Sequence, residues 1–351
     1  MNYIGSKLSL LDFIEKSVDE VVGKNTDYTF CDLFAGTGAV GILFKEKGHQ
    51  VIANDIQYYS YVLNRHYIGN HKELKFKELF EIIPKLKSAN VSVRKIIVCK
   101  YLQALKGIKG FVFKNYCPQK LENDRLYFTA ENGQKCDAIR KKIESWHNDN
   151  LINDDEYYFL LTTLLESIDK CANTASVYGA FLKNFKKSAL KTLQFLPAKL
   201  YINDNKHEVF NEDVNTIISK ISPDVIYLDP PYNARQYSTN YHMLETIAKN
   251  DNPEIHGKTG LRDYSKQKSL YCSRAKVKEA FADLINKSKA KYIFLSYNNE
   301  GLMSLDDIKD IMSKKGKYGV FKQECNRFKA DSNRDYSADK TVEYLHYVAC
   351  E

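Results

Sequence analysis

The sequence has no pair of cysteines at the close spacing of a zinc site or a redox motif. Its eight cysteines all stand more than four residues apart, so neither chemistry is indicated, and reduced, mostly buried thiols are expected. No apolar run approaches the length that spans a membrane. Residues 1–16 are amphipathic and include charges, so they lack the uninterrupted apolar core of a signal peptide. These absences predict a soluble, cytoplasmic protein.

Proline, glycine and internal repeats are also scarce. The 351 residues include 7 prolines and 16 glycines, and 44% of the chain is hydrophobic, which is an ordinary globular composition and excludes intrinsic disorder. No repeat, low-complexity tract or linker rich in Pro, Gly or Ser interrupts the chain. The length allows one large domain or two smaller ones.

Positive charge is present but concentrated in one stretch. The formal net charge is +8, and residues 71–120 alone carry twelve Lys or Arg against three Glu and no Asp. A lysine-rich face can serve solubility alone. Over residues 95–116, however, the basic residues are interleaved with Phe, Tyr and Gly, a pattern that favours binding along a phosphate backbone. Lys95, Lys100 and Lys106 are the residues that we assign to such contacts.

The order of strand and helix patterns predicts an α/β fold. Residues 28–33 are typical of a strand and lead into a glycine turn, a helix over 39–47 and a second strand over 49–54. Two successive strand–helix units imply parallel pairing with a right-handed crossover. Later strands are predicted at 207–210, 224–228 and 292–295, with an edge hairpin at 318–325 and 341–349.

A long helical stretch separates the two groups of strands. Between about residues 58 and 200 the apolar residues recur at helical spacing, most clearly over 154–171. We therefore predict one domain formed by residues 1–70 together with 200–351. Residues 71–199 are predicted to form an inserted, helical and basic domain.

The first chemical motif is the turn after the first strand, Asp32-Leu33-Phe34-Ala35-Gly36-Thr37-Gly38. Its glycines let the backbone approach a ligand, and the helix that follows presents free amides at its N-terminus. Dinucleotide-binding folds use the same device with a different spacing. Asp55 ends the next strand, where an acid can hold a ribose or simply cap a helix. The glycine turn and Asp55 together indicate a nucleotide-type cofactor.

The second motif is Asp229-Pro230-Pro231-Tyr232, directly after an apolar run. The prolines stiffen the end of the strand and leave carbonyl groups at the crevice. The Asp229 carboxylate and the Pro230 carbonyl can each accept one N–H of an exocyclic amine and localise its lone pair for attack on a sulfonium methyl. Tyr232 offers a ring on which a base can stack.

These two motifs, together with the N-terminal segment Asn2 to Lys7, resemble the N6-adenine DNA methyltransferases of the Dam-like, D12 class. The resemblance implies a Rossmann-like S-adenosylmethionine-dependent methyltransferase sheet. It implies methyl transfer to N6 of a flipped adenine in double-stranded DNA at a specific short sequence, with the inserted domain as the target-recognition domain. It further implies a bacterial or phage restriction–modification system with a cognate restriction endonuclease as partner.

The resemblance also assigns the cofactor residues. Asp55 would bond the ribose hydroxyls, and Asp213 would hold the cofactor adenine, in preference to its neighbour Glu212 because it stands third after a strand. The other cofactor residues that it implies are Tyr3, Gly5, Ser6, Lys7, Asp32, Phe34, Ala35, Gly36, Thr37, Gly38 and Asp229.

Two loops and one strand end complete the expected site. Arg235 follows the catalytic turn and is a phosphate contact or a surface salt bridge. Residues 262–274, which end at Arg274, are polar and basic like a loop that meets DNA, although a disordered surface loop fits nearly as well. Residues 296–299 are assigned to a wall of the base pocket, and His242 and Glu245 to packing or capping.

Three other functions remain open from the sequence. The amine-gripping motif also suits adenine in RNA or N4 of cytosine, although Asp229 favours adenine by the same resemblance. A non-catalytic DNA-binding specificity subunit is disfavoured because it would not need Asp229 beside two prolines. We expect no metal ion and no membrane partner. The methylated nitrogen is acidic enough to lose its proton to water, so no strong base is expected either.

Overall fold

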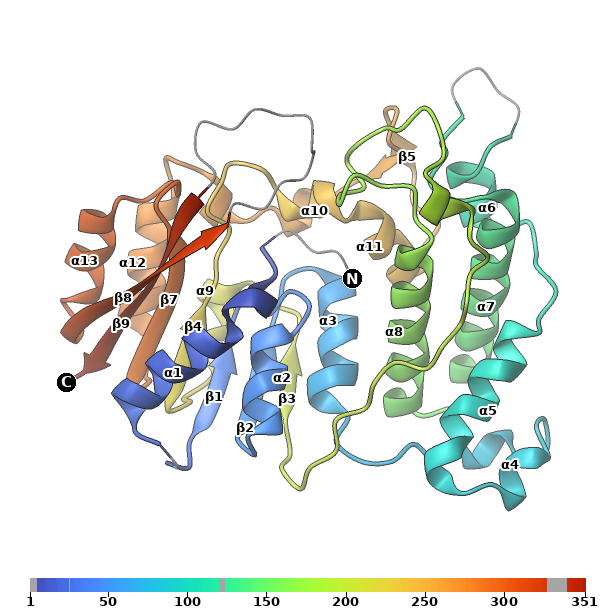
Figure 1. Ribbon diagram of the computed structural model, residues 1–351, viewed down its shortest axis with the longest axis horizontal. Helices are drawn as coiled ribbons and strands as arrows, with labels where there is room; N and C mark the ends of the chain where they lie inside the picture. Colours follow the sequence, from blue (N-terminus) through green and yellow to red (C-terminus); the bar gives the residue numbers. More distant parts are fainter. Residues whose placement is uncertain (1–4, 25, 120–123, 327–339) are drawn as a thin grey trace. The chain divides into compact units, whose positions relative to one another are not determined.

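The computed structural model describes residues 5–24, 26–119, 124–326 and 340–351 (Figure 1). The chain divides into two compact units. Among the described residues, the sheet unit comprises 5–64, 203–238, 264–326 and 340–351. The helical unit comprises Arg65–Ile202 and Thr239–Asp263 within the described residues. The second of these segments had been placed in the other domain from the sequence.

The sheet unit is built on seven strands in the order β3-β2-β1-β4-β7-β9-β8. Neighbouring strands from β3 to β7 pair in parallel, whereas β9 is antiparallel to both β7 and β8. This confirms the predicted Rossmann-like α/β class. The strands are β1 (Thr29–Asp32), β2 (Gln50–Asn54), β3 (Glu208–Phe210), β4 (Val225–Leu228), β7 (Tyr292–Asn298), β8 (Gly316–Asn326) and β9 (Lys340–Cys350).

Helices cover both faces of this sheet because its central strands are apolar on both sides. On one face, Phe30 stacks on Phe44 of α2 (Ala39–Glu46), near α1 (Leu11–Val22). On the other face, alternate strand residues such as Cys31 and Ile226 join one buried cluster with Phe281. That cluster is closed by α9 (Val214–Ile217), α12 (Val277–Lys287) and α13 (Leu305–Met312).

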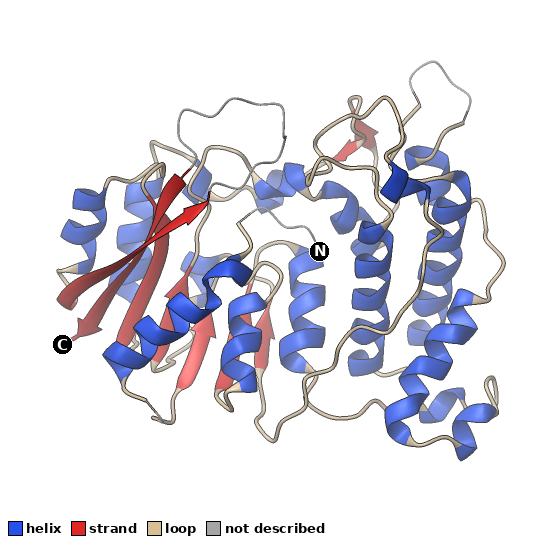
Figure 2. Ribbon diagram, viewed as in Figure 1, coloured by secondary structure: helices blue, strands red, loops and turns tan. Residues whose placement is uncertain are grey.

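The helical unit contains most of the long helices (Figure 2). Within it, α7 packs against α8, and a capping box of Asn153 and Glu156 starts α8. The apolar face of α8 includes the fully buried Leu160, Leu164 and Ile168. The elements are α4 (Lys85–Ser88), α5 (Val91–Gln103), α6 (Phe111–Tyr116), α7 (Ala130–Asn148), α8 (Asp154–Lys170), α11 (His242–Lys249), β5 (Ile255–His256) and β6 (Leu261–Arg262).

Residues 239–263 belong to the helical unit because buried contacts tie α11 to α7 and α8. Arg140 of α7 donates to the carbonyls of Ile247 (2.9 Å) and Ala248 (3.0 Å), the last turn of α11. A cation at the C-terminus of a helix satisfies carbonyls that lack helical partners. His242 is buried in the same packing, where desolvation lowers its pKa to about 4, as expected for a structural histidine.

The predicted strands agree with the observed ones to within one or two residues, except that β7 runs on to Asn298. It does so because β9 pairs with it along its whole length. The expected edge hairpin is β8–β9, with β8 at the edge and β9 inside the sheet. The seven cysteines whose side chains are described are all free. Among the helices of the described residues, none combines the length and apolarity needed to cross a bilayer.

Candidate active site

Four carboxylates stand at the carboxyl edge of the parallel strands. Asp32 ends β1 and Asp55 directly follows β2. Asp229 directly follows β4, and Asp213 comes three residues after β3. Because the strand order is β3-β2-β1-β4, the acids line one edge in the order Asp213, Asp55, Asp32, Asp229. This edge is where α/β folds bind ligands, and a row of acids suits an elongated ligand with positive charge.

The glycine turn after β1 is held in a backbone shape that favours glycine. Gly36 (φ 52°) and Gly38 (φ 81°) both adopt left-handed conformations. A Cβ on Gly38 would lie 2.8 Å from Oδ1 of Asn64. The carbonyl of Gly36 accepts from the Ser60 hydroxyl (2.6 Å) and the Asn64 amide (3.1 Å). These hydrogen bonds hold the turn in place, while the first backbone amides of α2 lack helical partners and lie at the edge of the sheet.

Asp55 joins the glycine turn to the start of the next helix. Its Oδ2 accepts from the amide of Gly36 (2.9 Å), and its Oδ1 accepts from the amide of Gln57 (2.8 Å). A carboxylate has about four acceptor positions, so an acid that accepts from backbone amides can also be a ligand for ribose hydroxyls. Asp55 is thus both the helix-capping acid and a candidate ligand residue, the two roles that the sequence left open.

Asn54 connects the ends of three adjacent strands, a role that the sequence did not indicate. Its side chain is buried, its Nδ2 donates to the carbonyl of Leu33 (3.3 Å), and its Oδ1 accepts from the amide of Glu212 (3.0 Å). These bonds place the loop after β3 beside the turn after β1. Glu212 itself pairs with Lys220, which leaves Asp213 as the candidate acid of that loop.

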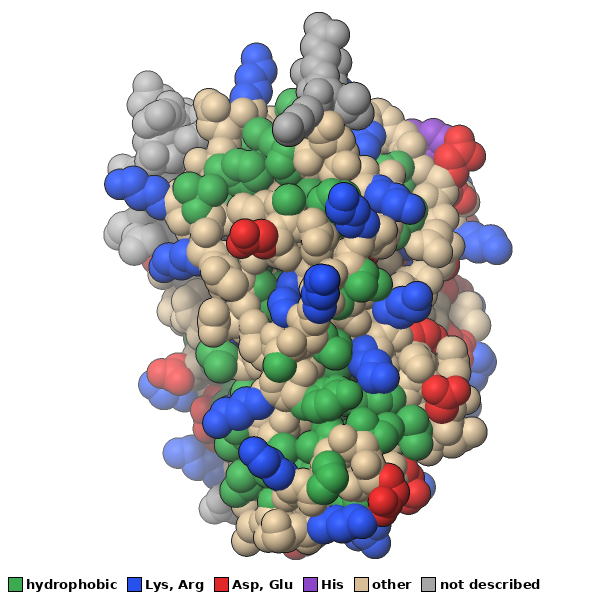
Figure 3. Space-filling model, turned by 90° about the vertical axis from the view of Figure 1, so that its right-hand side faces the viewer, with side chains coloured by type: hydrophobic (Ala, Val, Ile, Leu, Met, Phe, Trp, Pro, Cys, Tyr) green, Lys and Arg blue, Asp and Glu red, His purple; other side chains and the backbone are tan. Residues whose placement is uncertain are grey.

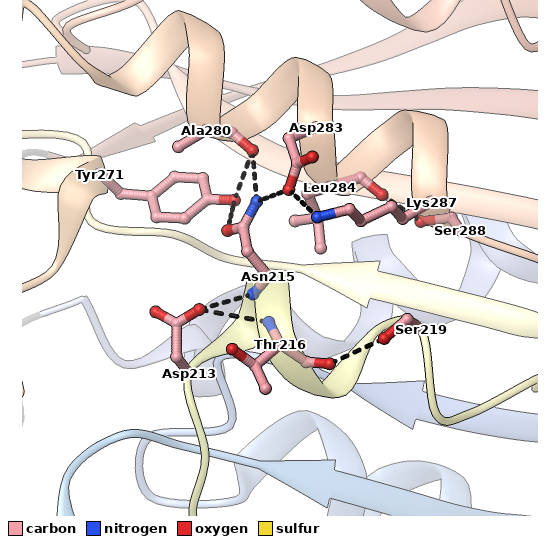
Figure 4. A network of polar contacts seen from close by, with 10 residues as sticks. All are labelled: Asp213, Asn215, Thr216, Ser219, Tyr271, Ala280, Asp283, Leu284, Lys287 and Ser288. Atoms are coloured by element: carbon pink, nitrogen blue, oxygen red, sulfur yellow. Dashed lines mark hydrogen bonds and ion pairs between the residues drawn. The ribbon is translucent and has the colours of Figure 1, made fainter.

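Asp213 is oriented by a polar network between α9 and α12 (Figure 4). Its Oδ1 caps α9 by accepting from the amides of Asn215 (3.0 Å) and Thr216 (3.3 Å). Asn215 in turn donates to the carbonyl of Ala280 (2.8 Å), and the Tyr271 hydroxyl donates to Oδ1 of Asn215 (3.1 Å). Figure 4 shows that one oxygen of the Asp213 carboxylate takes part in these bonds and that the second oxygen lies outside them.

Asp229 takes part in a buried group of charges. Lys7 Nζ lies 3.1 Å from Oδ1 of Asp229 and 2.6 Å from Oε1 of Glu343 on β9. The Ser296 hydroxyl donates to the same Glu343 oxygen (3.0 Å). The side chains of Lys7, Asp229 and Glu343 are 7%, 17% and 8% exposed. Two carboxylates and one ammonium therefore share a largely desolvated space with a net charge of −1.

Burial and neighbouring charge shift the pKa values of two acids in this group. Desolvation raises the pKa of Asp229 to about 6, with Lys7 opposing the shift and Glu343 adding to it. Burial also raises the pKa of Asp32 well above its usual range, and the charges of Asp229 and Asp55 act in the same direction. Acids whose charged form is disfavoured in this way gain most when a cation binds beside them.

The rest of the Asp229 motif is anchored by backbone and packing. Pro230 is buried, and Pro231 and Tyr232 are partly buried. The carbonyl of Tyr232 accepts from the amide of Leu302 (3.1 Å), and its ring packs against the core cluster of the sheet. The prolines keep this turn stiff because their φ angles are fixed.

The residues at this edge fit the S-adenosylmethionine that the resemblance implies. Oδ1 of Asp32 is buried and has no hydrogen-bond partner among the described residues, so it can accept from a ligand. Gly5 has φ +79°, a conformation that favours glycine, and a Cβ there would lie 3.0 Å from the Tyr237 hydroxyl. Phe34 meets Tyr271 edge to face, with ring centroids 5.0 Å apart, which provides an aromatic surface.

Several expectations differ from the structure. Ser296 and Tyr297 are 2% and 1% exposed and bond inside the sheet unit, so they do not form an open wall of a base pocket. The reason is that β7 continues through them. Arg262 is also buried, and its guanidinium pairs with Asp251 (2.5 Å), so the basic loop does not begin with a free cation. Lys7, expected at the cofactor, is paired with Asp229 and Glu343.

The basic candidates for DNA contact differ in how they are engaged. Lys100 and Lys106 are exposed, and neither forms an ion pair with another described residue, whereas Lys95 pairs with Glu73 (3.2 Å). Figure 3 shows one face on which scattered Lys and Arg side chains lie among exposed hydrophobic ones. Arg235 and Arg274 are exposed, and no described residue forms an ion pair with either.

The remaining site residues are also accounted for. Tyr3 lies outside the described residues. Ser6 precedes the short helix Lys7–Leu10, and Ala35 and Thr37 belong to the glycine turn. Glu343 was not found from the sequence, since no motif marks it and it is 336 residues from Lys7. Within the described residues, no group of three His, Cys, Asp or Glu side chains could hold a metal ion.

Comparisons with known proteins show a consistent pattern. The family described as D12 class N6 adenine-specific DNA methyltransferase matches residues 3–311. The chain is 50% identical to the Type II methyltransferase M.NlaIII of Neisseria lactamica over 351 residues, covering 99% of both chains. It is 36% identical to the Type II methyltransferase M.CviAII of Paramecium bursaria Chlorella virus 1, covering 100% of this chain and 99% of that one.

A longer relative shares only part of its length. The chain is 38% identical to the Type II methyltransferase M.FokI of Planomicrobium okeanokoites over 357 residues. That match covers 99% of this chain but 52% of the relative.

Proposed function

The chain belongs to the D12 class of N6-adenine-specific DNA methyltransferases, and we propose how its residues perform that reaction. It is a site-specific enzyme of the Type II restriction–modification kind and uses S-adenosylmethionine. The observation that carries our residue assignment is the ordered row of four acids at the carboxyl edge, which ends at Asp229 beside two prolines.

We assign the cofactor to that row, with its adenine at Asp213, its ribose at Asp55 and its methionine end at Asp32. When bound, S-adenosylmethionine supplies an electrophilic methyl group on a positively charged sulfonium. The unpartnered Oδ1 of Asp32 supports this direction, because a buried acceptor needs a donor such as an ammonium group. Gly5, Ser6, Phe34 and the glycine turn complete the enclosure.

The chemical task of Asp229 and Pro230 is to make the adenine amine nucleophilic. The lone pair of N6 is delocalised into the ring, which leaves the amine a poor nucleophile. The Asp229 carboxylate and the Pro230 carbonyl each accept one N–H, which favours tetrahedral nitrogen and localises the lone pair towards the methyl group. The nitrogen becomes cationic as the N–C bond forms, and it then loses its proton to solvent.

An adenine inside a duplex cannot reach this edge, so the base has to be extruded. We assign Tyr232 to stacking on the extruded base. Lys100, Lys106, Arg235 and Arg274 are exposed cations that suit contact with phosphates of double-stranded DNA. Residues 71–199 are our candidate for target recognition, a cognate endonuclease is the partner expected from the class, and the cytoplasm is the expected location.

Replacement of Asp229 by alanine tests the assignment. Asp229→Ala should lower the single-turnover rate of DNA methylation by about 10³-fold, because an acceptor used in the transition state is removed. Cofactor and DNA affinities should change much less. Single-molecule sequencing of DNA from a methylation-free host that expresses each variant reports the modification and its sequence context together.

A matched control is available in the same unit. Asp306 is exposed on α13, away from the motif in sequence, and Asp306→Ala should methylate like the wild type. N6-methyladenine at the same sites and level with Asp229→Ala would remove Asp229 from the mechanism. Methylation of RNA, or of cytosine in place of adenine, would leave Asp229 as the acceptor for the amine but would change the substrate.

A further inference from the structure

The buried pair Lys7–Glu343 has no evident structural reason to lie under the catalytic motif. The two residues are 336 positions apart, and both are largely desolvated. Desolvating an ion pair usually costs more than its Coulomb attraction returns, so such pairs are poor devices for stability. Lys7 Nζ is also 3.1 Å from Oδ1 of Asp229. The ammonium therefore bridges two carboxylates of which one is the proposed catalytic acceptor.

The pair contacts Asp229 in a way that limits the position of its carboxylate. Asp229 lies at the end of β4, Glu343 lies in β9, and Lys7 begins a short helix near the N-terminus. Ser296 of β7 donates to the Glu343 oxygen that also contacts Lys7. Glu343 is thus held from two sides, Lys7 is held by Glu343, and Asp229 is held by Lys7.

We propose that Lys7, anchored by Glu343, is a positioning residue that keeps the Asp229 carboxylate ionised and aimed at the adenine amine. This inference rests on the proposed role of Asp229. It replaces the cofactor contact expected for Lys7 from the sequence with a contact to the acid itself. Oδ1 of Asp229 is engaged by Lys7, which leaves Oδ2 as the oxygen to accept the N–H.

All charged and titratable groups around Asp229 bear on this role. From β9, Glu343 repels a second negative charge, and from β1 Asp32 does the same. Tyr227 of β4 and Tyr232 have pKa values raised by burial, so both stay neutral at working pH. Lys7 supplies the positive charge that opposes desolvation and Glu343 at Asp229. Removing its charge should therefore favour the protonated acid, which cannot act as a full acceptor.

The two members of the pair should have opposite electrostatic effects. Lys7→Met removes an opposite charge, so the pKa of Asp229 should rise by about one to two pH units. Glu343→Gln removes a like charge while retaining a hydrogen-bond acceptor for Lys7, so that pKa should fall. A residue that served only packing would not move a titration in opposite directions through two partners.

The experiment is a pH profile of single-turnover methylation at saturating S-adenosylmethionine and saturating duplex DNA. The wild type, Lys7→Met, Lys7→Arg and Glu343→Gln are compared, with cofactor affinity measured separately by calorimetry. The acid limb should move to higher pH in Lys7→Met, stay near the wild type in Lys7→Arg, and move to lower pH in Glu343→Gln. At about pH 7, Lys7→Met should be slower by about two- to tenfold, the loss of ionised Asp229 that a rise of about one to two pH units implies, with cofactor affinity changed less than about threefold.

The other end of β4 provides a matched control. Asp224 directly precedes β4 and pairs with Lys291 at 2.8 Å, but Lys291 is exposed. Lys291→Met removes a Lys–Asp pair from the same strand at the end away from the site. Its rate and pH profile should match those of the wild type.

Other outcomes separate this inference from the proposed function. Unmoved acid limbs in both Lys7→Met and Glu343→Gln would overturn the positioning role. So would loss of cofactor affinity alone in Lys7→Met, which would restore Lys7 to the cofactor. If Lys7→Met does not fold, the direction of the Glu343→Gln shift decides the question. An active Asp229→Ala enzyme would overturn the proposed function instead, whatever the Lys7 variants do.

Discussion

Two groups of buried charged side chains, one in the helical unit and one in the sheet unit, are satisfied by different kinds of partner. In the helical unit, Asp137 accepts from three backbone amides and Arg140 donates to two backbone carbonyls. In the sheet unit, Lys7, Asp229 and Glu343 bond to one another. A buried charge that serves the backbone fixes a loop or a helix end. A buried carboxylate whose partner is another charged side chain, as Lys7 is for Asp229, remains available for chemistry.

Among the tests of this contrast, removal of the Asp137 carboxylate should give the largest effect, a loss of folding stability. Its Oδ atoms accept from the amides of Gly110 (3.0 Å), Val112 (2.9 Å) and Phe113 (2.9 Å) at the start of α6. Asp137→Ala leaves three donors unsatisfied and should reduce the free energy of unfolding by about 4 kcal/mol. Chemical denaturation followed by circular dichroism measures it. Asp229→Ala should lose far less stability, and equal losses in the two variants would break the contrast.

Surface cations of the helical unit should give a smaller effect, on DNA binding only. Lys100→Glu with Lys106→Glu removes two exposed cations, so the slope of log K against log salt should become shallower by about 2. Fluorescence anisotropy of labelled duplex DNA, at salt concentrations from about 50 to about 200 mM, measures the slope. Lys95→Glu should change it less because Lys95 is paired with Glu73. An unchanged slope would return this stretch to a solubility role.

The pH dependence of the wild type sharpens the contrast within the sheet unit. The pKa of Asp229 is about 6 against an ordinary value of 3.8, so the active carboxylate forms as pH rises through about 6. The methylation rate should fall about fivefold between about pH 6 and about pH 5, because the ionised fraction of Asp229 falls by that factor. The contribution of Asp229 to folding stability has the opposite dependence on pH. Between pH 3.8 and 6 the folded state binds a proton that the unfolded state has lost, so its contribution decreases as pH rises.

Comparison with Asp229→Asn checks both signs. This variant cannot titrate at position 229, so its stability should lack that pH-dependent contribution. A wild-type methylation rate that does not change between about pH 5 and about pH 7 would contradict the assigned role of the carboxylate.

The smallest expected effect concerns the network around Asp213. Tyr271→Phe removes the hydroxyl that donates to Asn215 but keeps the ring beside Phe34. Loss of one neutral hydrogen bond costs about 1 kcal/mol, so cofactor affinity should fall by less than tenfold. Isothermal titration with S-adenosylhomocysteine measures it. A loss as large as that of Asp213→Ala would mean that the tyrosine itself contacts the cofactor.

The sheet unit could be predicted well because its candidate site residues directly follow the strands. Asp32 to Gly38, Asp55 and Asp229 all follow short apolar runs, and parallel pairing brings such positions to one edge. Asp213 was preferred to Glu212 because the family resemblance places the acid third after the strand, and the salt bridge of Glu212 with Lys220 is consistent with that choice. Its contact with a cofactor remains a prediction.

What could not be predicted depends on contacts between distant positions. Glu343 stands in an ordinary edge-strand sequence, and only the insertion of β9 beside β7 brings it to Lys7. Residues 262–274 were predicted as a polar, basic loop from composition, which does not reveal that Arg262 at its start pairs with Asp251. Chain order placed residues 239–263 with the strands, whereas their contacts group them with the helical unit, and the contact of Arg140 with α11 leaves no local pattern in the sequence.

The position of β9 has a consequence for the timing of biosynthesis. This strand lies inside the sheet between β7 and β8, yet it is the last of the seven to be translated. Contacts of such high sequence separation form late, because the intervening chain must be made and ordered first. The Asp229–Lys7–Glu343 group therefore cannot assemble while the nascent polypeptide still lacks residue 343. The anchor of Lys7 is therefore among the last parts of the site to be completed.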